Sequence, residues 1–327
     1  MKTENEESPE FEQGRREGAQ VRPLANGGQW QLANVLLPEL VDVIFRYASQ
    51  DKATISACAL VSRGWRELAL PHLFSDLKFR TRNARPLKHF QDFIDAHPHI
   101  ARYVRKLELI AVLDTPMDPL RPLDLRTLAA VVTSLAGLRV LYLCEPFFDG
   151  TDSALTSSSS IMLPRRLEKL TVDICRDEED TSTTSITTLI GVLRTFPADS
   201  VHLSYFDIAC VPPSDPRMAQ LIQSSSNSMH VIDLKLDRLD GSRYGLERLG
   251  LGHLFDALCH VLKPGYLRSL QCRPYKGSDY GDTAKQLFGK FLHHTAETLQ
   301  DLALPFLLRL PVRYEEYKPG MGHASGH

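Results

Sequence analysis

Short segments in which apolar and polar residues alternate recur along most of this chain. In residues 103–109, Val104, Leu107 and Leu109 are spaced as in a strand that buries one face. The same V-x-x-L-x-L form returns six times, at intervals of roughly 30 residues. The six triplets are Leu138/Leu141/Leu143, Leu167/Leu170/Val172, Ala198/Val201/Leu203, Met229/Ile232/Leu234, Leu267/Leu270/Cys272 and Leu299/Leu302/Leu304. The pattern predicts about seven strands of one repeating unit.

Apolar residues between these strands follow the three-to-four-residue spacing of a helix face. The predicted faces are Leu125/Leu128/Val132/Leu135, Ile186/Leu189/Ile190/Leu193, Leu254/Leu258/Val261 and Leu287/Phe288/Phe291/Leu292. One strand and one helix cannot enclose an apolar core, so successive units have to stack on each other. We therefore predict an α/β fold in which about seven strand-plus-helix repeats span residues 86–312 as an irregular solenoid. A non-repetitive α/β fold is the alternative.

Residues 34–76 have a different pattern, which predicts three short helices. The first helix carries an apolar stripe at Leu37, Leu40, Val41, Ile44 and Ala48, and Pro38 suits its first turn. Asn34 is a candidate cap for this helix, Asp51 or Ser49 for the second, and Ser62 for the third, which contains Trp65. About 40 residues are too few to enclose a stable core alone, so we expect this segment to dock on another protein.

Two motifs in this segment, LPEL at 37–40 and LVSRGW at 60–65, resemble the F-box, the motif that attaches substrate receptors to the Skp adaptor of cullin ubiquitin ligases. Ser62 departs from the Cys that the family usually has there. The resemblance implies that the adaptor is contacted by Leu36, Leu37, Pro38, Leu40, Ile44, Leu60, Val61 and Trp65. Without it, these segments would be ordinary helices of a larger α-helical core.

The repeats in turn resemble leucine-rich repeats, although loosely. That family normally places Asn or Cys three residues beyond the last strand leucine, and only Cys175 stands at such a position here. The resemblance implies a solenoid that presents one sheet face to a protein ligand.

Residues between the inward leucines should lie on the opposite face of the sheet, because side chains alternate along a strand. The candidate target-binding residues on this face are Glu108, Tyr142, Thr171, His202, Asp233 and Gln271. We expect Tyr142 and His202 to be the main anchors. The set mixes both charges with uncharged groups, which favours a protein segment over a nucleic acid. Binding through loops such as 150–160 is the alternative.

Composition restricts the classes of binding partner and the cellular compartment that we expect for this chain. The chain has 327 residues and a formal charge of -2, and no basic stripe appears along it, so we expect no nucleic-acid partner. Its six cysteines are widely spread and follow no secretory segment, which favours the cytoplasm or the nucleus. No apolar run is long enough to span a membrane. The acidic residues 1–30 should be disordered, and residues 313–327 should form a tail.

We find no motif that indicates catalysis. Phosphate-binding loops and nucleophile elbows are absent from the sequence. Neither His97 with His99 nor the adjacent His293 and His294 has a spacing that favours a metal site. His253, Asp256 and Cys259 share a predicted helix, but Cys259 is expected in the core beside Leu258. We therefore expect no enzyme activity, no cofactor and no metal.

Together the two resemblances predict the substrate-recognition subunit of a Skp, cullin and F-box E3 ubiquitin ligase. The helices would bind the Skp adaptor, and through it a cullin, while the repeats would bind an unknown protein substrate. A protein-interaction scaffold that acts without a ligase is the alternative.

Overall fold

The structure is a computed structural model of the chain. It describes residues 36–81, 85–111, 125–144, 165–173, 184–204, 208–209, 219–220, 222–223, 228–239, 250–274 and 282–304. The predicted disordered segment 1–30, the loop at 150–160 and the tail 313–327 lie outside these residues, as do Asn34 and Cys175.

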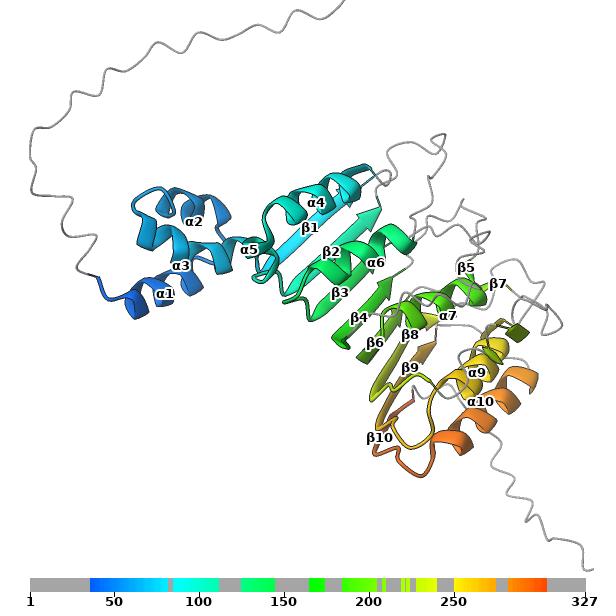
Figure 1. Cartoon of the computed structure of the whole chain (residues 1–327). Coiled ribbons are helices and arrows are strands. Elements are labelled where there is room, and N and C mark those ends of the chain that lie inside the picture. The colour runs from blue at the N-terminus through cyan, green and yellow to red at the C-terminus, as the bar shows by residue number, and fades with distance from the viewer. Residues whose placement is uncertain are drawn as a thin grey trace, which may run out of the picture.

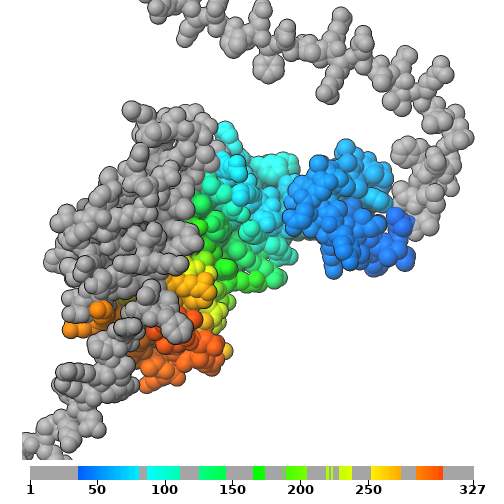
Figure 2. All heavy atoms as spheres, turned by 180° about the vertical axis from the view of Figure 1, so that it is seen from behind, coloured from blue at the N-terminus to red at the C-terminus, as the bar shows by residue number. Residues whose placement is uncertain are grey.

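Three short helices begin the described chain, as the sequence predicts: α1 (Pro38–Tyr47), α2 (Lys52–Cys58) and α3 (Arg63–Phe74). Asp51 rather than Ser49 caps α2, with its Oδ1 accepting from Thr54 N at 3.0 Å. Ser62 caps α3 by accepting from Trp65 N at 3.2 Å. The helices form a lobe at the end of the molecule beside β1, coloured blue in Figure 2.

An eight-stranded parallel sheet follows, and its strand order is the order of the strands along the chain. The strands are β1 (Asp76–Thr81), β2 (Lys106–Ala111), β3 (Val140–Cys144), β4 (Leu167–Asp173), β6 (Ala198–Ser204), β8 (Asp233–Leu239), β9 (Ser269–Pro274) and β10 (Asp301–Ala303). A separate two-stranded sheet pairs β5 (Thr184–Ser185) with β7 (Ile208–Ala209). The α/β class with a parallel sheet is thus confirmed.

Helices between the strands lie along one face of the large sheet (Figure 1). They are α4 (Arg85–Ala96), α6 (Leu125–Ser134), α7 (Ile186–Thr195), α9 (Gly250–Val261) and α10 (Asp282–Thr295), with the single turn α5 (Pro98–Ala101) before β2. Because the helices gather on one face, the opposite face carries no described helix, and its side chains can meet a partner.

The predicted leucines form the core between sheet and helices. Leu107, Leu141 and Leu170 are fully buried, and they pair in register across β2, β3 and β4. The predicted helix faces point into the same core, where Leu128 and Leu258 are also fully buried. Parallel strands covered by helices bury apolar side chains in this way.

Two parts of the repeat prediction need correction. The fifth predicted strand corresponds to β8. Its buried apolar triplet is Val231, Leu234 and Leu236 rather than Met229, Ile232 and Leu234, because Leu234 pairs with Val201 and Leu270. The sequence contains both apolar triplets, and only the pairing with neighbouring strands selects one. In addition, β1 and α4 precede the first predicted strand. The spacing of Phe74, Leu77 and Phe79 matches the strand triplets, but β1 was missed because Phe74 was assigned to the helical segment before it.

Candidate docking surfaces

The three N-terminal helices enclose a small core of their own. Val41, Phe45, Ile55 and Ala69 are buried there, with Trp65 packed against them. The rings of Phe45 and Trp65 meet edge to face, with centroids 5.9 Å apart. This core aligns α1 with α3 and determines which residues of α1 remain exposed.

The apolar stripe predicted for α1 divides between two faces. Val41 and the unpredicted Phe45 point inward, whereas Leu37, Leu40 and Ile44 are 63%, 51% and 46% exposed. Phe45 lies four residues after Val41, and this i, i+4 spacing is the signal that could have identified it.

Most of the predicted adaptor contacts form an exposed apolar set on this lobe. Leu36 is 42% exposed, Leu60 86% and Val61 43%, and Pro38 is exposed beside them. The structure adds Val43 and Tyr47, which the prediction lacks. Trp65 differs from the rest, because it is half-buried in the small core. We call the exposed residues Leu36, Leu37, Pro38, Leu40, Val43, Ile44, Tyr47, Leu60 and Val61 the apolar patch.

Polar contacts join α1 to α3 on another side of the lobe. His72 Nε2 lies 2.9 Å from Asp42 Oδ1, and Arg46 reaches Asp42 Oδ2 at 2.6 Å. The hydrogen bond from His72 and the charge of Arg46 lower the pKa of Asp42. Lys52 donates to the backbone carbonyl of His72 and so joins α2 to the same cluster.

The second candidate surface is the open face of the large sheet. Five predicted target-binding residues form one row across it: Glu108, Tyr142, Thr171, His202 and, two strands further on, Gln271. The corrected fifth strand places Lys235 in this row between His202 and Gln271. Asp233 instead lies in the neighbouring row, level with Ser200 and Ser269.

Tyr142 and His202 each bond to an aspartate on the next strand. Tyr142 OH donates to Asp173 Oδ2 at 2.9 Å, and His202 Nε2 lies 3.1 Å from Asp237 Oδ2. Burial and then Asp173 raise the pKa of the Tyr142 hydroxyl, so the phenol stays protonated. Neither aspartate was predicted, although each stands two residues after a residue of the row.

His202 is surrounded by charge of both signs. Burial, then Lys235, lower its pKa, while Asp237 acts in the opposite direction. The imidazole is therefore neutral at pH 7, and its Nε2–H donates to Asp237. Lys235 Nζ also donates to Asp237, at 2.7 Å. The second oxygens of Asp173 and Asp237, both Oδ1, are buried and accept no hydrogen bond from the described residues, although Arg273 Nε lies 4.0 Å from Asp237 Oδ1.

At the β1–β2 end of this face the charges are paired. Glu108 accepts from Lys78 at 2.7 Å and from Lys106 at 3.3 Å. Burial raises the pKa of Glu108, but the two lysines outweigh it and lower the pKa. Between this group and His202, Thr171 is buried and Tyr142 is half-buried, so of these two predicted residues only Tyr142 offers surface to a partner.

The groups considered for catalysis are placed elsewhere. Cys259 is buried in the core, and burial raises its pKa to about 11, so it does not form a thiolate at neutral pH. Asp256 pairs with Lys290 at 2.8 Å. No three His, Cys, Asp or Glu side chains in the described ranges are arranged to hold a metal ion.

The chain matches no protein-family model and no curated protein. None of the described helices has both the length and the apolar character needed to cross a membrane.

Proposed function

We propose that this protein is the substrate-recognition subunit of a Skp, cullin and F-box E3 ubiquitin ligase, which acts in the cytoplasm or the nucleus. The carrying observation is the apolar patch, which a small self-contained helical lobe leaves exposed. Leu37, Leu40, Ile44 and Tyr47 share one face of α1 by their three- to four-residue spacing, and an apolar face left exposed on a protein surface marks a site of protein interaction. The protein itself performs no chemistry in this proposal and needs no cofactor or metal.

The lobe supports the F-box half of the proposal. LPEL and LVSRGW, which carry the resemblance, contribute most of the patch: Leu37, Pro38 and Leu40 from the first, and Leu60 and Val61 from the second. Residues that the resemblance assigns to the adaptor are thus exposed rather than committed to the small core, with Trp65 as the exception. Trp65 would act by holding α3 against Phe45.

The sheet supports the receptor half. Strands that pair in chain order, with helices on one face, are the arrangement that stacked strand-plus-helix repeats require, and we interpret it as an irregular leucine-rich-repeat solenoid. Its open face would bind the substrate around Tyr142 and His202.

Substitutions in the apolar patch test the adaptor contact. The double variant Leu37→Ala/Leu40→Ala should lose co-purification of purified Skp adaptor and cullin, while its circular dichroism stays unchanged. Phe93→Ala is the matched control, because Phe93 is 38% exposed on α4, outside the patch. If the double variant retains the adaptor fully, the ligase assignment is wrong.

A second experiment addresses the substrate. The unchanged chain and the variant Tyr142→Ala/His202→Ala are each purified from cells under cullin blockade. Quantitative mass spectrometry then compares the proteins recovered with each. Selective loss of some proteins, with adaptor retained, supports binding at the open face. The alternative function, a scaffold that acts without a ligase, is supported if protein partners are recovered while adaptor and cullin never are.

A further inference from the structure

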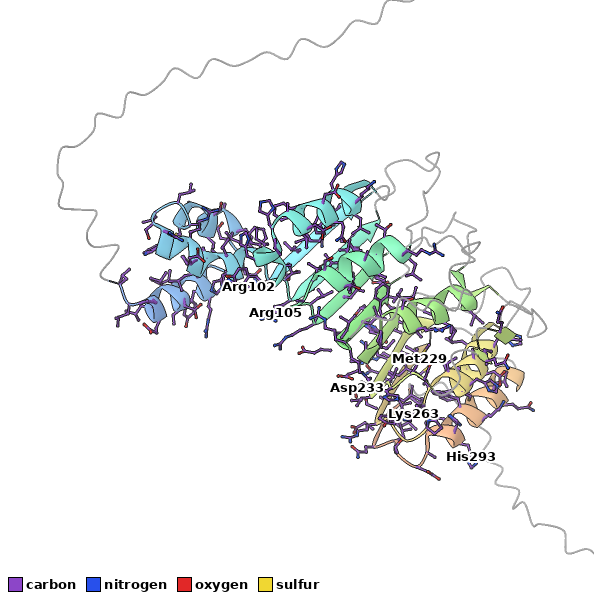
Figure 3. All side chains as sticks on the ribbon, in the orientation of Figure 1. Arg102, Arg105, Met229, Asp233, Lys263 and His293 are labelled. Carbon is purple, nitrogen blue, oxygen red and sulfur yellow. The ribbon has the colours of Figure 1, made fainter. Side chains whose placement is uncertain are left out.

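Arginines that are far apart in the sequence meet where the first strands of the sheet begin. Arg102 and Arg105 precede β2, Arg139 precedes β3, and Arg165 and Arg166 precede β4. Because all strands are parallel, their starting ends share one edge of the sheet, on which Figure 3 labels Arg102, Arg105, Asp233 and Lys263. We call the five arginines the arginine rim.

Backbone hydrogen bonds hold the rim in register. The carbonyl of Arg105 accepts from Arg139 N at 2.8 Å and from Val140 N at 3.0 Å, and the carbonyl of Arg139 accepts from Glu168 N at 2.8 Å. Neighbouring strands lie about 4.8 Å apart, so the residues that precede β2, β3 and β4 fall within about 10 Å of one another. The rim is therefore a compact feature.

Among the described residues, three side chains of the rim use few of their donors. Arg105 donates to the carbonyl of Gly137 at 3.2 Å, and Arg165 donates to the carbonyl of Leu135. Arg102 donates to the hydroxyl of its neighbour Tyr103 at 2.7 Å. Each guanidinium has five N–H groups, so most donors of these three arginines remain for another partner.

Charge on the rim is only partly compensated. Arg139 pairs with Glu168 at 3.0 Å and Arg166 with Asp199 at 2.9 Å. Within the described part of the chain, Arg102, Arg105 and Arg165 have no carboxylate partner. Burial, and then the charge of Arg105, lower the pKa of Arg165, which agrees with two guanidiniums lying near each other without an anion between them. The rim thus keeps an excess of positive charge in a chain whose formal charge is -2.

Carboxylates fit this arrangement better than a nucleic-acid backbone does. Guanidinium forks bind carboxylates, and Glu168 and Asp199 each already contact one of the arginines through a single nitrogen–oxygen pair. Those same two acids would repel a continuous row of phosphates. Further along the edge, Asp233 and Asp301 begin β8 and β10 on either side of Arg268, which precedes β9, so acidic groups accompany the basic ones there and the excess of positive charge is confined to the first strands. Its extent suits a short peptide.

We propose that the arginine rim binds an acidic segment of a protein partner, whose Asp or Glu side chains pair with Arg102, Arg105 and Arg165. In the proposed ligase this partner is the substrate. The identification of the partner as a substrate rests on the proposed function, whereas the binding of an acidic segment does not. The rim then provides a second contact beside the open face, because Lys106, the first residue of β2, and Lys169 of β4 lie one residue beyond Arg105 and Glu168.

The test uses the full chain and a fluorescein-labelled deca-glutamate peptide, with binding followed by fluorescence anisotropy at low salt. Arg102→Gln/Arg105→Gln removes two exposed rim charges of the proposed contact and should weaken binding about three- to tenfold. Arg80→Gln/Lys88→Gln removes two exposed charges away from the rim, at the end of β1 and on α4, and should change binding less than about twofold. Added salt should weaken binding of the unchanged chain.

Three results would overturn the proposal: no binding of the peptide at low salt, an equal loss in both double variants, or tighter binding of a ten-nucleotide single strand than of the peptide. If Arg102→Gln/Arg105→Gln loses its circular dichroism, Arg102→Gln alone decides the outcome, because among the described residues that side chain bonds to its neighbour Tyr103 and to no other element. The adaptor pull-down is run on the same variants. Because adaptor binding and peptide binding are measured on the same variants, a failure of the ligase proposal can be told apart from a failure of the rim proposal.

Discussion

Two glycines should respond to the same substitution with opposite signs. Gly137 lies in the turn between α6 and β3, and a Cβ there would stand 2.4 Å from the carbonyl oxygen of Arg102 and 2.9 Å from that of Val104. Gly289 lies inside α10, and a Cβ there would meet nothing within 4 Å. Gly137→Ala forces backbone apart, whereas Gly289→Ala only adds a better helix former.

The magnitudes follow from these contacts. Overpacking that moves backbone costs about 1–3 kcal/mol, so Gly137→Ala should lower the free energy of unfolding by that amount. Replacing Gly by Ala within a helix is worth about 0.5–1 kcal/mol, so Gly289→Ala should raise it. For a domain of this size 1 kcal/mol corresponds to a shift in Tm of about 2–4 °C.

Urea denaturation followed by circular dichroism measures both changes, and an unchanged slope shows that the same surface unfolds in each variant. The Gly137 variant should also bind the acidic peptide less well, because Arg105 donates to the Gly137 carbonyl. Equal stability of Gly137→Ala and the unchanged chain would refute the reasoning, since it would mean that the turn can move away from residues 102–104 without cost.

Three other predictions concern side chains. Phe45→Ala should destabilise the helical lobe by about 3–5 kcal/mol and abolish adaptor binding, as seen by limited proteolysis and pull-down. Because the pKa of His202 is lowered, the fold should lose stability as the pH falls below about 6.5, and His202→Gln should reduce that loss in urea titrations at pH 7.5 and 5.5. Peptide mapping after brief iodoacetamide treatment should show Cys58 alkylated well before Cys272, whose pKa burial raises to about 12. Equal labelling of the two would show that the core opens readily.

The sequence by itself determined the apolar core of the repeats. Strand leucines such as Leu141 and Leu170 and helix residues such as Leu128 could be predicted because burial on one face imposes a period of two on strands and of about 3.6 on helices. The caps Asp51 and Ser62 were predictable for a similar reason, since a helix start leaves amides that a nearby side chain must satisfy.

Only the tertiary structure decided questions in which distant segments compete or combine. Two apolar triplets fitted the fifth strand, and pairing with Val201 and Leu270 selected the one that contains Leu236. Which residues of α1 face the small core depends on α3, because Trp65 packs on Phe45, while Leu40 stays exposed.

The arginine rim is the clearest case of this second kind. Its residues are separated by roughly 30 positions along the chain, so the sequence shows no basic stripe. Parallel strands in chain order bring the residues before each strand to one edge, about 4.8 Å apart per strand. Charge therefore gathers on this edge through strand pairing, a long-range interaction that local sequence patterns do not encode.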